Sequence, residues 1–389
     1  MNRVYLDNAA TTPVSEAVLQ KMLPYFRQQY GNASSVYQTG REARRAIDEA
    51  RRQAAAAINA KPAEVYFTGG GSESDNWAIK GAAFARRDKG NHIITTAIEH
   101  HAVLHTCEWL EKQGFEITYL PVDEYGRVTA GQVEKAITDQ TILITIMAAN
   151  NEIGTLEPIA EIAKVARARK VLFHTDAVQA FGAVPVDVQA WDVDLLTLSA
   201  HKFHGPKGVG LLYIRQGIRL DNLVHGGAQE RGKRAGTENL AGIVGMAQAM
   251  EIASASQQEN HKRLSALRDS LIQGILHKIP DVRLNGHPED RLPGNVNVSI
   301  RYIEGEAMLL RLDLAGIAAS SGSACTSGSL DPSHVLLAIG LPHEIAHGSL
   351  RFSLSDESTQ DDVDAVLEVL PGIVQTLRDM SPIYPKKEV

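Results

Sequence analysis

A lysine that could form a covalent bond to a carbonyl compound lies near the middle of the chain. Lys202 stands in a turn rich in Gly and Pro, between two apolar runs at 193–198 and 209–214 that we interpret as buried strands. A lysine at the end of a buried strand is costly without a partner, and one chemical use of such a lysine is a Schiff base. The alternative is an ordinary surface-loop lysine beside Lys207.

Three further strand ends bear residues that could bind a ligand. Asn151 and Asp176 each follow a predicted strand, and the glycine turn Gly69–Ser72 joins a predicted strand to a helical stretch. A strand, a glycine turn and a helix start together present backbone N–H groups to an anion. The turn is not a Walker loop, because no Gly-Lys-Ser/Thr follows it. A bare connecting turn is the alternative.

Strands and helices alternate through the first part of the chain, which predicts a largely parallel sheet with covered faces. Ligands bind outside the carboxyl ends of the strands in such sheets, so the four strand ends are expected at one edge. The predicted strands are 64–68, 92–96, 116–120, 142–147, 171–175, 193–198 and 209–214. The predicted helices are 15–27, 40–58, 75–87, 101–112, 131–137, 158–169 and 240–278. Short strands at 295–300 and 350–354 and a last helix at 360–379 predict a smaller α+β domain.

Length and composition restrict the class of protein. A chain of 389 residues is long for one core, and we predict a large domain at 15–258 and a smaller one built from 1–14 and 259–389. The net charge of −7 argues against a nucleic-acid-binding surface. No apolar run is long enough to cross a membrane, and a content of two cysteines fits a reducing cytoplasm.

The residues at the strand ends match the needs of pyridoxal 5'-phosphate. This cofactor uses a lysine for its aldehyde, a carboxylate at its ring nitrogen and N–H or hydroxyl groups for its phosphate. Lys202 could supply the first and Asp176 the second, while Gln179 is near enough in sequence to donate to the ring hydroxyl. The candidate phosphate ligands are Gly71, Ser72, Ser199 and His201.

The two cysteines have different surroundings. Cys325 lies in a segment, 320–329, that is nearly all Ser, Gly, Ala and Thr, a composition that cannot pack a core and favours mobility. Cys107 lies in an apolar helical pattern and is expected to be a buried small hydrophobe. The same buried role is the alternative for Cys325.

Several motifs together resemble the cysteine desulfurases of the class V aminotransferase superfamily. The resemblance extends in order from about residue 4 to about residue 383, and the cysteine segment and the ending Ser381-Pro382 look closest to NifS-like, nitrogen-fixation members. The motifs that resemble the family are Tyr5–Pro13, Glu73–Asn76, Glu99-His100, Asn150–Gly154, His174–Gln179, Ser199–Gly208, Arg234–Asn239 and Ser321–Gly328. The resemblance implies the type I fold of pyridoxal-phosphate transferases, with a mostly parallel seven-stranded sheet in the large domain and a smaller α+β domain.

The resemblance also implies a role for each matched residue. Lys202 is similar to the lysine that binds the cofactor and moves the Cα proton, and His100 to the histidine stacked on the cofactor ring. Asn151 and Arg351 match contacts to the substrate carboxylate. Asp176 and Gln179 match ring ligands, and Ser72, Ser199 and His201 match phosphate ligands, with Gly69-Gly70-Gly71 departing from the usual residues of that turn.

The implied reaction involves partners as well. Thr237 matches a phosphate ligand that reaches the cofactor of a partner subunit, which implies a homodimer. Cys325 matches the residue that takes sulfur from L-cysteine as a persulfide, with L-alanine as product, and passes it to an iron–sulfur scaffold or another acceptor protein. A flexible segment at 322–333 with a contour on the order of 40 Å makes such a transfer geometrically possible.

Other interpretations explain fewer of these residues. The sequence 343–347 matches the zinc-protease pattern His-Glu-x-x-His, but Pro342 precedes it and Gly348 follows it, so we predict no metal site. A class V aminotransferase or a selenocysteine lyase on the same scaffold remains an alternative, although a transaminase would not need Cys325 in its Ser/Gly segment. A sulfur carrier without turnover is an alternative of another class, and it would not need Lys202, Asp176 and His100 together.

Overall fold

The structure, a computed structural model, describes residues 3–321 and 332–385, so Cys325 lies outside the described residues. The larger domain is built on a seven-stranded sheet in the order β2-β8-β7-β6-β5-β3-β4. Its strands are β2 Val65–Thr68, β3 His92–Thr96, β4 Glu116–Leu120, β5 Thr141–Thr145, β6 Leu172–Asp176, β7 Leu195–Ser199 and β8 Gly210–Ile214. Neighbours from β4 to β7 are parallel, which confirms the predicted mostly parallel sheet.

One strand of the sheet runs against its neighbours. β8 pairs antiparallel with both β7 and β2. Because two reversals cancel, β2 runs in the same direction as β7, and the Gly69–Ser72 turn after β2 opens at the same edge as Ser199 after β7. The four predicted strand ends therefore share one edge, as the sequence predicts.

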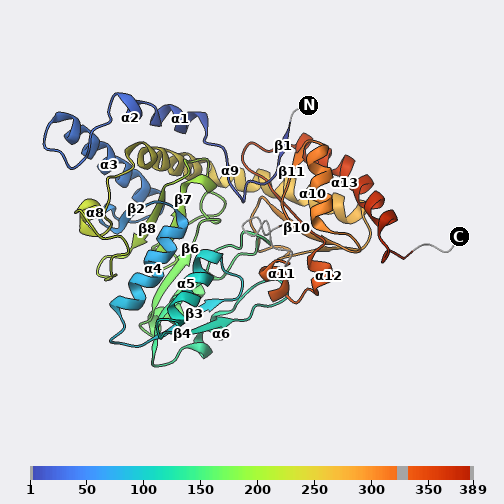
Figure 1. Cartoon of the computed structure of the whole chain (residues 1–389), viewed down its shortest axis with the longest axis horizontal. Helices are drawn as coiled ribbons and strands as arrows, with labels where there is room; N and C mark the ends of the chain where they lie inside the picture. Colours follow the sequence, from blue (N-terminus) through green and yellow to red (C-terminus); the bar gives the residue numbers. More distant parts are fainter. Residues whose placement is uncertain (1–2, 322–331, 386–389) are drawn as a thin grey trace.

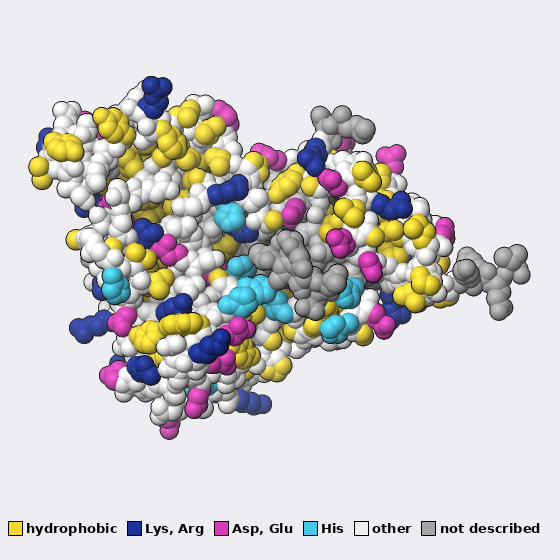
Figure 2. All heavy atoms as spheres, in the orientation of Figure 1, with side chains coloured by type: hydrophobic (Ala, Val, Ile, Leu, Met, Phe, Trp, Pro, Cys, Tyr) yellow, Lys and Arg dark blue, Asp and Glu magenta, His cyan; other side chains and the backbone are white. Residues whose placement is uncertain are grey.

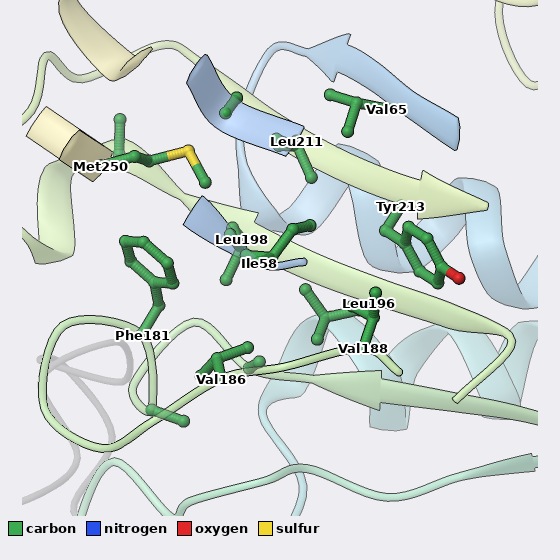
Figure 3. Packing of buried hydrophobic residues seen from close by; sticks show 14 of the residues in the cluster. Ile58, Val65, Phe181, Val186, Val188, Leu196, Leu198, Leu211, Tyr213 and Met250 are labelled. Atoms are coloured by element: carbon green, nitrogen blue, oxygen red, sulfur yellow. The ribbon is translucent and has the colours of Figure 1, made fainter. Parts of the chain in front are cut away.

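Helices cover both faces of this sheet (Figure 1). Successive strand residues point to opposite faces. Leu196 and Leu198 of β7 accordingly join the apolar cluster under α3 (Gln38–Ala57) and α9 (Leu240–Lys278), whereas Leu195 joins the cluster under α4 (Gly71–Ala85) and α5 (His101–Glu111). Figure 3 shows Leu196 and Leu198 packed beside Leu211 and Tyr213 of β8. The helices of this part are α1 Glu16–Met22, α2 Pro24–Arg27, α3 Gln38–Ala57, η1 Pro62–Glu64, α4 Gly71–Ala85, α5 His101–Glu111, α6 Ala130–Ala136, α7 Ile159–Ala168, η2 Ala200–Lys202, α8 Gln229–Gly232 and α9 Leu240–Lys278.

The smaller domain is an α+β unit joined to the larger one through α9 (Figure 1). It contains an antiparallel sheet in the order β12-β10-β9 and a parallel pair of β1 with β11. These elements are β1 Val4–Tyr5, β9 Val282–Leu284, β10 Asn295–Ile300, β11 Ile317–Ala318, β12 Ser349–Ser353, α10 Gly305–Leu314, α11 His334–Ala338, α12 His343–Ala346 and α13 Gln360–Met380. The first turns of α9 pack in the core of the large sheet, and its later turns pack against β10 and α13. The limits at residues 15 and 258 stay a prediction.

The structure differs from the predicted elements at a few places, each with a physical cause. The prediction of a single helix at 15–27 is wrong, because α1 ends before Pro24 and α2 begins at Pro24. A proline has no N–H to continue the hydrogen bonds of the preceding helix. The helix predicted from residue 75 begins at Gly71, so the glycine turn supplies its first residues. Within the described part of the chain, no helix is both long and apolar enough to cross a membrane.

A buried ion pair anchors the segment 225–239 to the large domain. Arg51 of α3 donates two hydrogen bonds of 2.7 Å to the carboxylate of Glu230, and their side chains are 7% and 3% exposed. The carboxylate of Glu230 also accepts the N–H of Phe67, and Arg51 also donates to the carbonyl of Val65. These contacts fix the start of a segment whose backbone has a positive φ at Glu230 and at Arg231.

We expect Arg51→Met to lower the free energy of unfolding by about 3–5 kcal/mol, because it leaves the buried carboxylate of Glu230 without its cation. Urea unfolding followed by circular dichroism measures the change. Arg52→Met is the matched control, since the ion pair of Arg52 with Glu49 is more than half exposed and should contribute under about 1 kcal/mol. Equal losses in the two variants would contradict the assignment.

Candidate active site

A cavity of about 640 Å³ lies at the edge where the strands end, between the large sheet and the smaller domain. Residues from both domains line it, and histidine side chains gather in the middle of the face shown in Figure 2. Ten of the residues predicted from the sequence are in its wall: Gly71, Ser72, His100, Asn151, Asp176, Gln179, Ser199, His201, Lys202 and Arg351.

Lys202 ends the short helix η2, immediately after β7. Its Nζ donates to the carbonyl oxygens of Ala9 and Ala10 at 2.6 and 2.8 Å. Gln179 donates to the same Ala9 oxygen at 3.0 Å. The N-terminal segment that contains Ala9 and Ala10 therefore forms part of the wall around the lysine amine, which the sequence analysis did not predict.

The first turn of α4 forms one end of the cavity. The N–H groups of a first helical turn have no acceptor inside the helix, and the helix dipole favours an anion there. A side chain at Gly71 would place its Cβ 3.1 Å from Val178 and 3.3 Å from Ser199, so glycine allows the helix to approach the ends of β6 and β7 closely. Ser72 follows in the same turn, and His201 also lines the cavity, with its Nδ1 3.1 Å from the hydroxyl of Thr11.

Two carboxyl groups lie buried at the base of the cavity. Asp176 ends β6 and accepts the N–H of Val178 at 2.9 Å. Asp75 of α4 lies nearby, and its Oδ1 has no hydrogen-bond partner among the described residues, with His174 Nε2 3.7 Å away. Burial raises the pKa of both groups, and the charge of Asp176 raises that of Asp75 further. A positively charged ring nitrogen placed here would favour an ionised Asp176.

His100 caps the start of α5 at the cavity and is held as a neutral ring. Its Nδ1 accepts the N–H of Ala102 at 3.1 Å, which leaves the proton on Nε2. Burial, followed by the charge of Lys202, lowers the pKa of His100 to about 4. The ring is therefore an uncharged flat surface with one N–H donor, which suits a stacked aromatic ligand.

His101 and His334 also line the cavity, in contact with His105 and Glu99, and the sequence analysis assigned no role to any of the four. The ring of His101 lies 5.0 Å from that of His105 and 4.8 Å from that of His334, between ring centres. His334 also donates to the carbonyl oxygen of Glu99, whose buried carboxylate accepts from the N–H of Met147. Burial raises the pKa of Glu99 to about 8. These contacts join α5 to α11, which lie far apart in the sequence.

Arg351 reaches the cavity from strand β12 of the smaller domain. Its guanidinium lies 2.8 Å from the carboxylate of Asp7 and donates to the carbonyl oxygen of Asn151 at 3.0 Å. The residue is 1% exposed. A planar guanidinium held in this way can bind a carboxylate through two parallel hydrogen bonds.

Two predicted residues are not joined to this set. Thr237 lies exposed on the segment 225–239 and does not line the cavity. Cys325 lies outside the described residues. The described residues on either side of it do lie near the cavity, because the N–H of Ser320 donates to the carbonyl of Arg351 and the hydroxyl of Ser333 donates to Glu152.

The donors in the wall fit pyridoxal 5'-phosphate. An amine stands at Lys202, a buried carboxyl group at Asp176 and a neutral ring at His100, while a helix start at Gly71 and Ser72 can bind a phosphate. These groups surround one space, as a single cofactor requires. Ala9 of the N-terminal segment and Asp75 of α4 also line that space, and the sequence analysis assigned no role to either.

Known proteins resemble the chain over nearly its whole length. The family model for class-V aminotransferases matches residues 4–366. A protein named cysteine desulfurase IscS from Methanosarcina thermophila is 61% identical over 384 residues, which is 99% of this chain and 95% of that protein. A protein of the same name from the Hall strain of Clostridium botulinum is 57% identical over 388 residues, which is 99% of this chain and 98% of that protein.

Solved structures agree with this likeness. A NifS-like protein superposes with a TM-score of 0.91 at 40% identity and covers 96% of this chain and 100% of its own. A protein described as SspA in complex with cysteine superposes with a TM-score of 0.80 at 39% identity, covering 90% of this chain and 98% of its own. The chain therefore belongs to the class-V aminotransferase family and, within it, to the cysteine desulfurases, which depend on pyridoxal 5'-phosphate.

Proposed function

We propose that the chain removes the sulfur atom of L-cysteine, releases L-alanine and holds the sulfur on Cys325 as a persulfide. The carbon–sulfur bond of the substrate breaks, and a sulfur–sulfur bond forms at Cys325. The substrate thiol and the Cys325 thiol bring one proton each: one proton stays on the persulfide and the other ends on the carbon that lost sulfur. The atoms balance without an added oxidant or reductant. The observation that supports this most strongly is that Lys202 of one domain and Arg351 of the other face the same cavity.

The cofactor, when bound, supplies an aldehyde for an amine and a ring that draws electrons from the substrate Cα. We propose that Lys202 holds the aldehyde, that Asp176 faces the ring nitrogen and that Gln179 faces the ring hydroxyl. The proposed phosphate ligands are Gly71, Ser72, Ser199 and His201. His100 covers the ring, and its neutral state supports this role because a cation there would oppose the protonated ring nitrogen.

Lys202 and Arg351 have separate tasks in this proposal. The amine of Lys202 lies between two backbone carbonyls, which can hold it in position when it takes or returns the Cα proton. The guanidinium of Arg351, with Asn151 beside it, binds the substrate carboxylate. The carboxylate of Asp7, which pairs with Arg351 in this structure, is a group that a substrate carboxylate would compete with.

The proposed assembly is a homodimer in which Thr237 reaches the cofactor phosphate of the partner subunit. The segment of Thr237 is exposed but anchored, because Arg234 pairs with Glu73 of α4 at 2.8 Å and Glu230 pairs with Arg51. Large apolar side chains are also exposed in and around α2 and just before α3, and such surfaces are commonly covered by a partner. They are Leu23, Phe26, Tyr30, Val36 and Tyr37.

The sulfur acceptor is proposed to be an iron–sulfur scaffold or another acceptor protein. Relatives that carry the name cysteine desulfurase IscS support this class of partner. A solved relative described in complex with cysteine supports L-cysteine as the small-molecule substrate. A cytoplasmic location and a link to nitrogen fixation stay predictions.

The two cysteines give a direct test of the function. We expect the wild-type protein to form alanine and a protein persulfide from L-cysteine without any keto acid, because no amino-group acceptor enters the reaction. Cys325→Ala should keep the visible absorbance of the bound cofactor but form no persulfide, measured by alkylation and mass spectrometry. Cys107→Ala is the control and should retain both products, because the Cys107 thiol is buried and burial raises its pKa.

Two outcomes would contradict this reading. Persulfide formation at an undiminished rate in Cys325→Ala would exclude Cys325 as the sulfur acceptor. Alanine that forms only when a keto acid is supplied would indicate an aminotransferase instead.

Arg351→Lys tests the substrate carboxylate contact. The lysine keeps the charge but loses the paired hydrogen bonds, and we expect KM for L-cysteine to rise roughly 10- to 100-fold, as for one charged hydrogen bond of about 1.5–3 kcal/mol. Steady-state alanine formation measures this, and the cofactor absorbance should be unchanged. Arg3→Lys is the control, because Arg3 forms an exposed ion pair with Asp313 in the same domain. An unchanged KM in Arg351→Lys would remove Arg351 from the site.

A further inference from the structure

His204 connects the turn of Lys202 to the smaller domain. It lies two residues after Lys202, and its Nε2 is 2.7 Å from the carboxylate of Asp356, which follows β12. Its Nδ1 is 3.1 Å from the carbonyl oxygen of Pro13. Its backbone N–H donates to the hydroxyl of Thr12 at 2.9 Å. One residue therefore joins the lysine turn, the N-terminal segment and the loop after β12.

The partners of the ring determine its charge. A carbonyl oxygen accepts a hydrogen bond but cannot donate one, and the same holds for an ionised carboxylate. A neutral imidazole has one N–H, so it could satisfy either Pro13 or Asp356 but not both. Both contacts require an N–H on each nitrogen, which makes His204 an imidazolium.

The charges around the pair agree with this assignment. Burial acts to lower the pKa of His204, but the hydrogen bond and charge of Asp356, with Glu357 beside it, raise that pKa above its ordinary value. The bond to His204 in turn lowers the pKa of Asp356, and Arg263 of α9 lowers it further. Arg263 also donates to the backbone carbonyls of Asp356 and Ser358, each at 2.6 Å, so the loop after β12 is held on two sides.

The position of this ion pair matters because the proposed site is divided between the domains. Lys202 follows β7 of the larger domain, whereas Arg351 lies in β12 of the smaller one. Asp356 comes five residues after Arg351, and His204 two residues after Lys202. A second cavity, of about 140 Å³ and mostly apolar, lies between these segments and is lined by His204, Asp356 and Lys202. The ion pair of His204 with Asp356 therefore links the two domains directly, close to Lys202.

We propose that His204 is a positioning residue: as an imidazolium bound to Asp356, it fixes the Lys202 turn relative to β12 and so sets the distance between Lys202 and Arg351. His204 does not line the cavity that holds the proposed active site. The functional meaning of this distance rests on the proposed function, while the charge of the ring rests on its two hydrogen bonds. The link is complete between the lowered pKa of Asp356 and the raised pKa of His204, and it loses one of its hydrogen bonds as the pH rises through the pKa of His204.

The charge can be measured without the reaction. Protein labelled with ¹⁵N-histidine is titrated by NMR, and His204→Gln assigns the signal. We expect both ring nitrogens of His204 to be protonated at pH 7, with a pKa above the ordinary value of about 6.5, and Asp356→Asn to lower that pKa. A neutral His204 at pH 7, or a pKa that Asp356→Asn leaves unchanged, would overturn the proposal.

A kinetic cycle tests the positioning. His204→Gln and Asp356→Asn should each raise KM for L-cysteine about tenfold, which is about 1.4 kcal/mol, with a smaller effect on kcat. The double variant should be no worse than either single one, because both remove the same link. Glu134→Gln, which removes an exposed ion pair with Arg169, is the control and should change neither constant.

Each outcome of the cycle is informative. Multiplying effects in the double variant, or a fall in kcat with an unchanged KM, would overturn the positioning role. If His204→Gln fails to fold, Asp356→Asn still reports on the link through KM. A wild-type protein that forms no alanine would contradict the proposed function, whereas the NMR result would still decide the charge of His204.

Discussion

The common direction of the strands is the constraint on which the site depends. β3, β5, β6 and β7 are parallel, and β2 has the same direction because β8, which lies between β2 and β7, is antiparallel to both. Every one of these strands therefore ends at the same edge, where backbone N–H groups and short polar side chains become available. A cofactor that needs an amine, a carboxylate and a phosphate site at once can bind there because separate strands supply the separate groups.

The smaller domain supplies Arg351 to the site, so its position relative to the edge of the large sheet must be fixed. The continuous helix α9 packs in both hydrophobic cores and connects the two domains rigidly. The N-terminal segment then crosses from the smaller domain to the lysine turn, where the carbonyls of Ala9 and Ala10 accept from Lys202. Polar contacts of this kind fix geometry where apolar packing alone would allow sliding. The ion pair of His204 with Asp356 belongs to the same set of contacts.

Much of this arrangement could be predicted from local sequence. The strands at 92–96, 116–120 and 295–300 and the helix at 240–278 have the predicted limits, because their apolar patterns are regular and their ends carry turn residues. Lys202 and Asp176 follow directly from their places after buried strands. The proximity of Asp75 to Asp176 and of Asp356 to His204 could not be predicted, since the members of each pair are more than 90 residues apart in the chain. Pairings at such distances depend on the assembled fold, and one sequence contains no local signal for them.

The attachment site of the cofactor is the most direct test of the central claim, that the strand ends form one site for pyridoxal 5'-phosphate. The protein with its cofactor would be reduced with borohydride, digested and mapped by mass spectrometry. We predict a pyridoxyl group on Lys202, whose amine lies at the carboxyl end of β7 inside the cavity. Attachment to Lys207 five residues later, or the absence of any attached group in protein that binds the cofactor, would contradict the account.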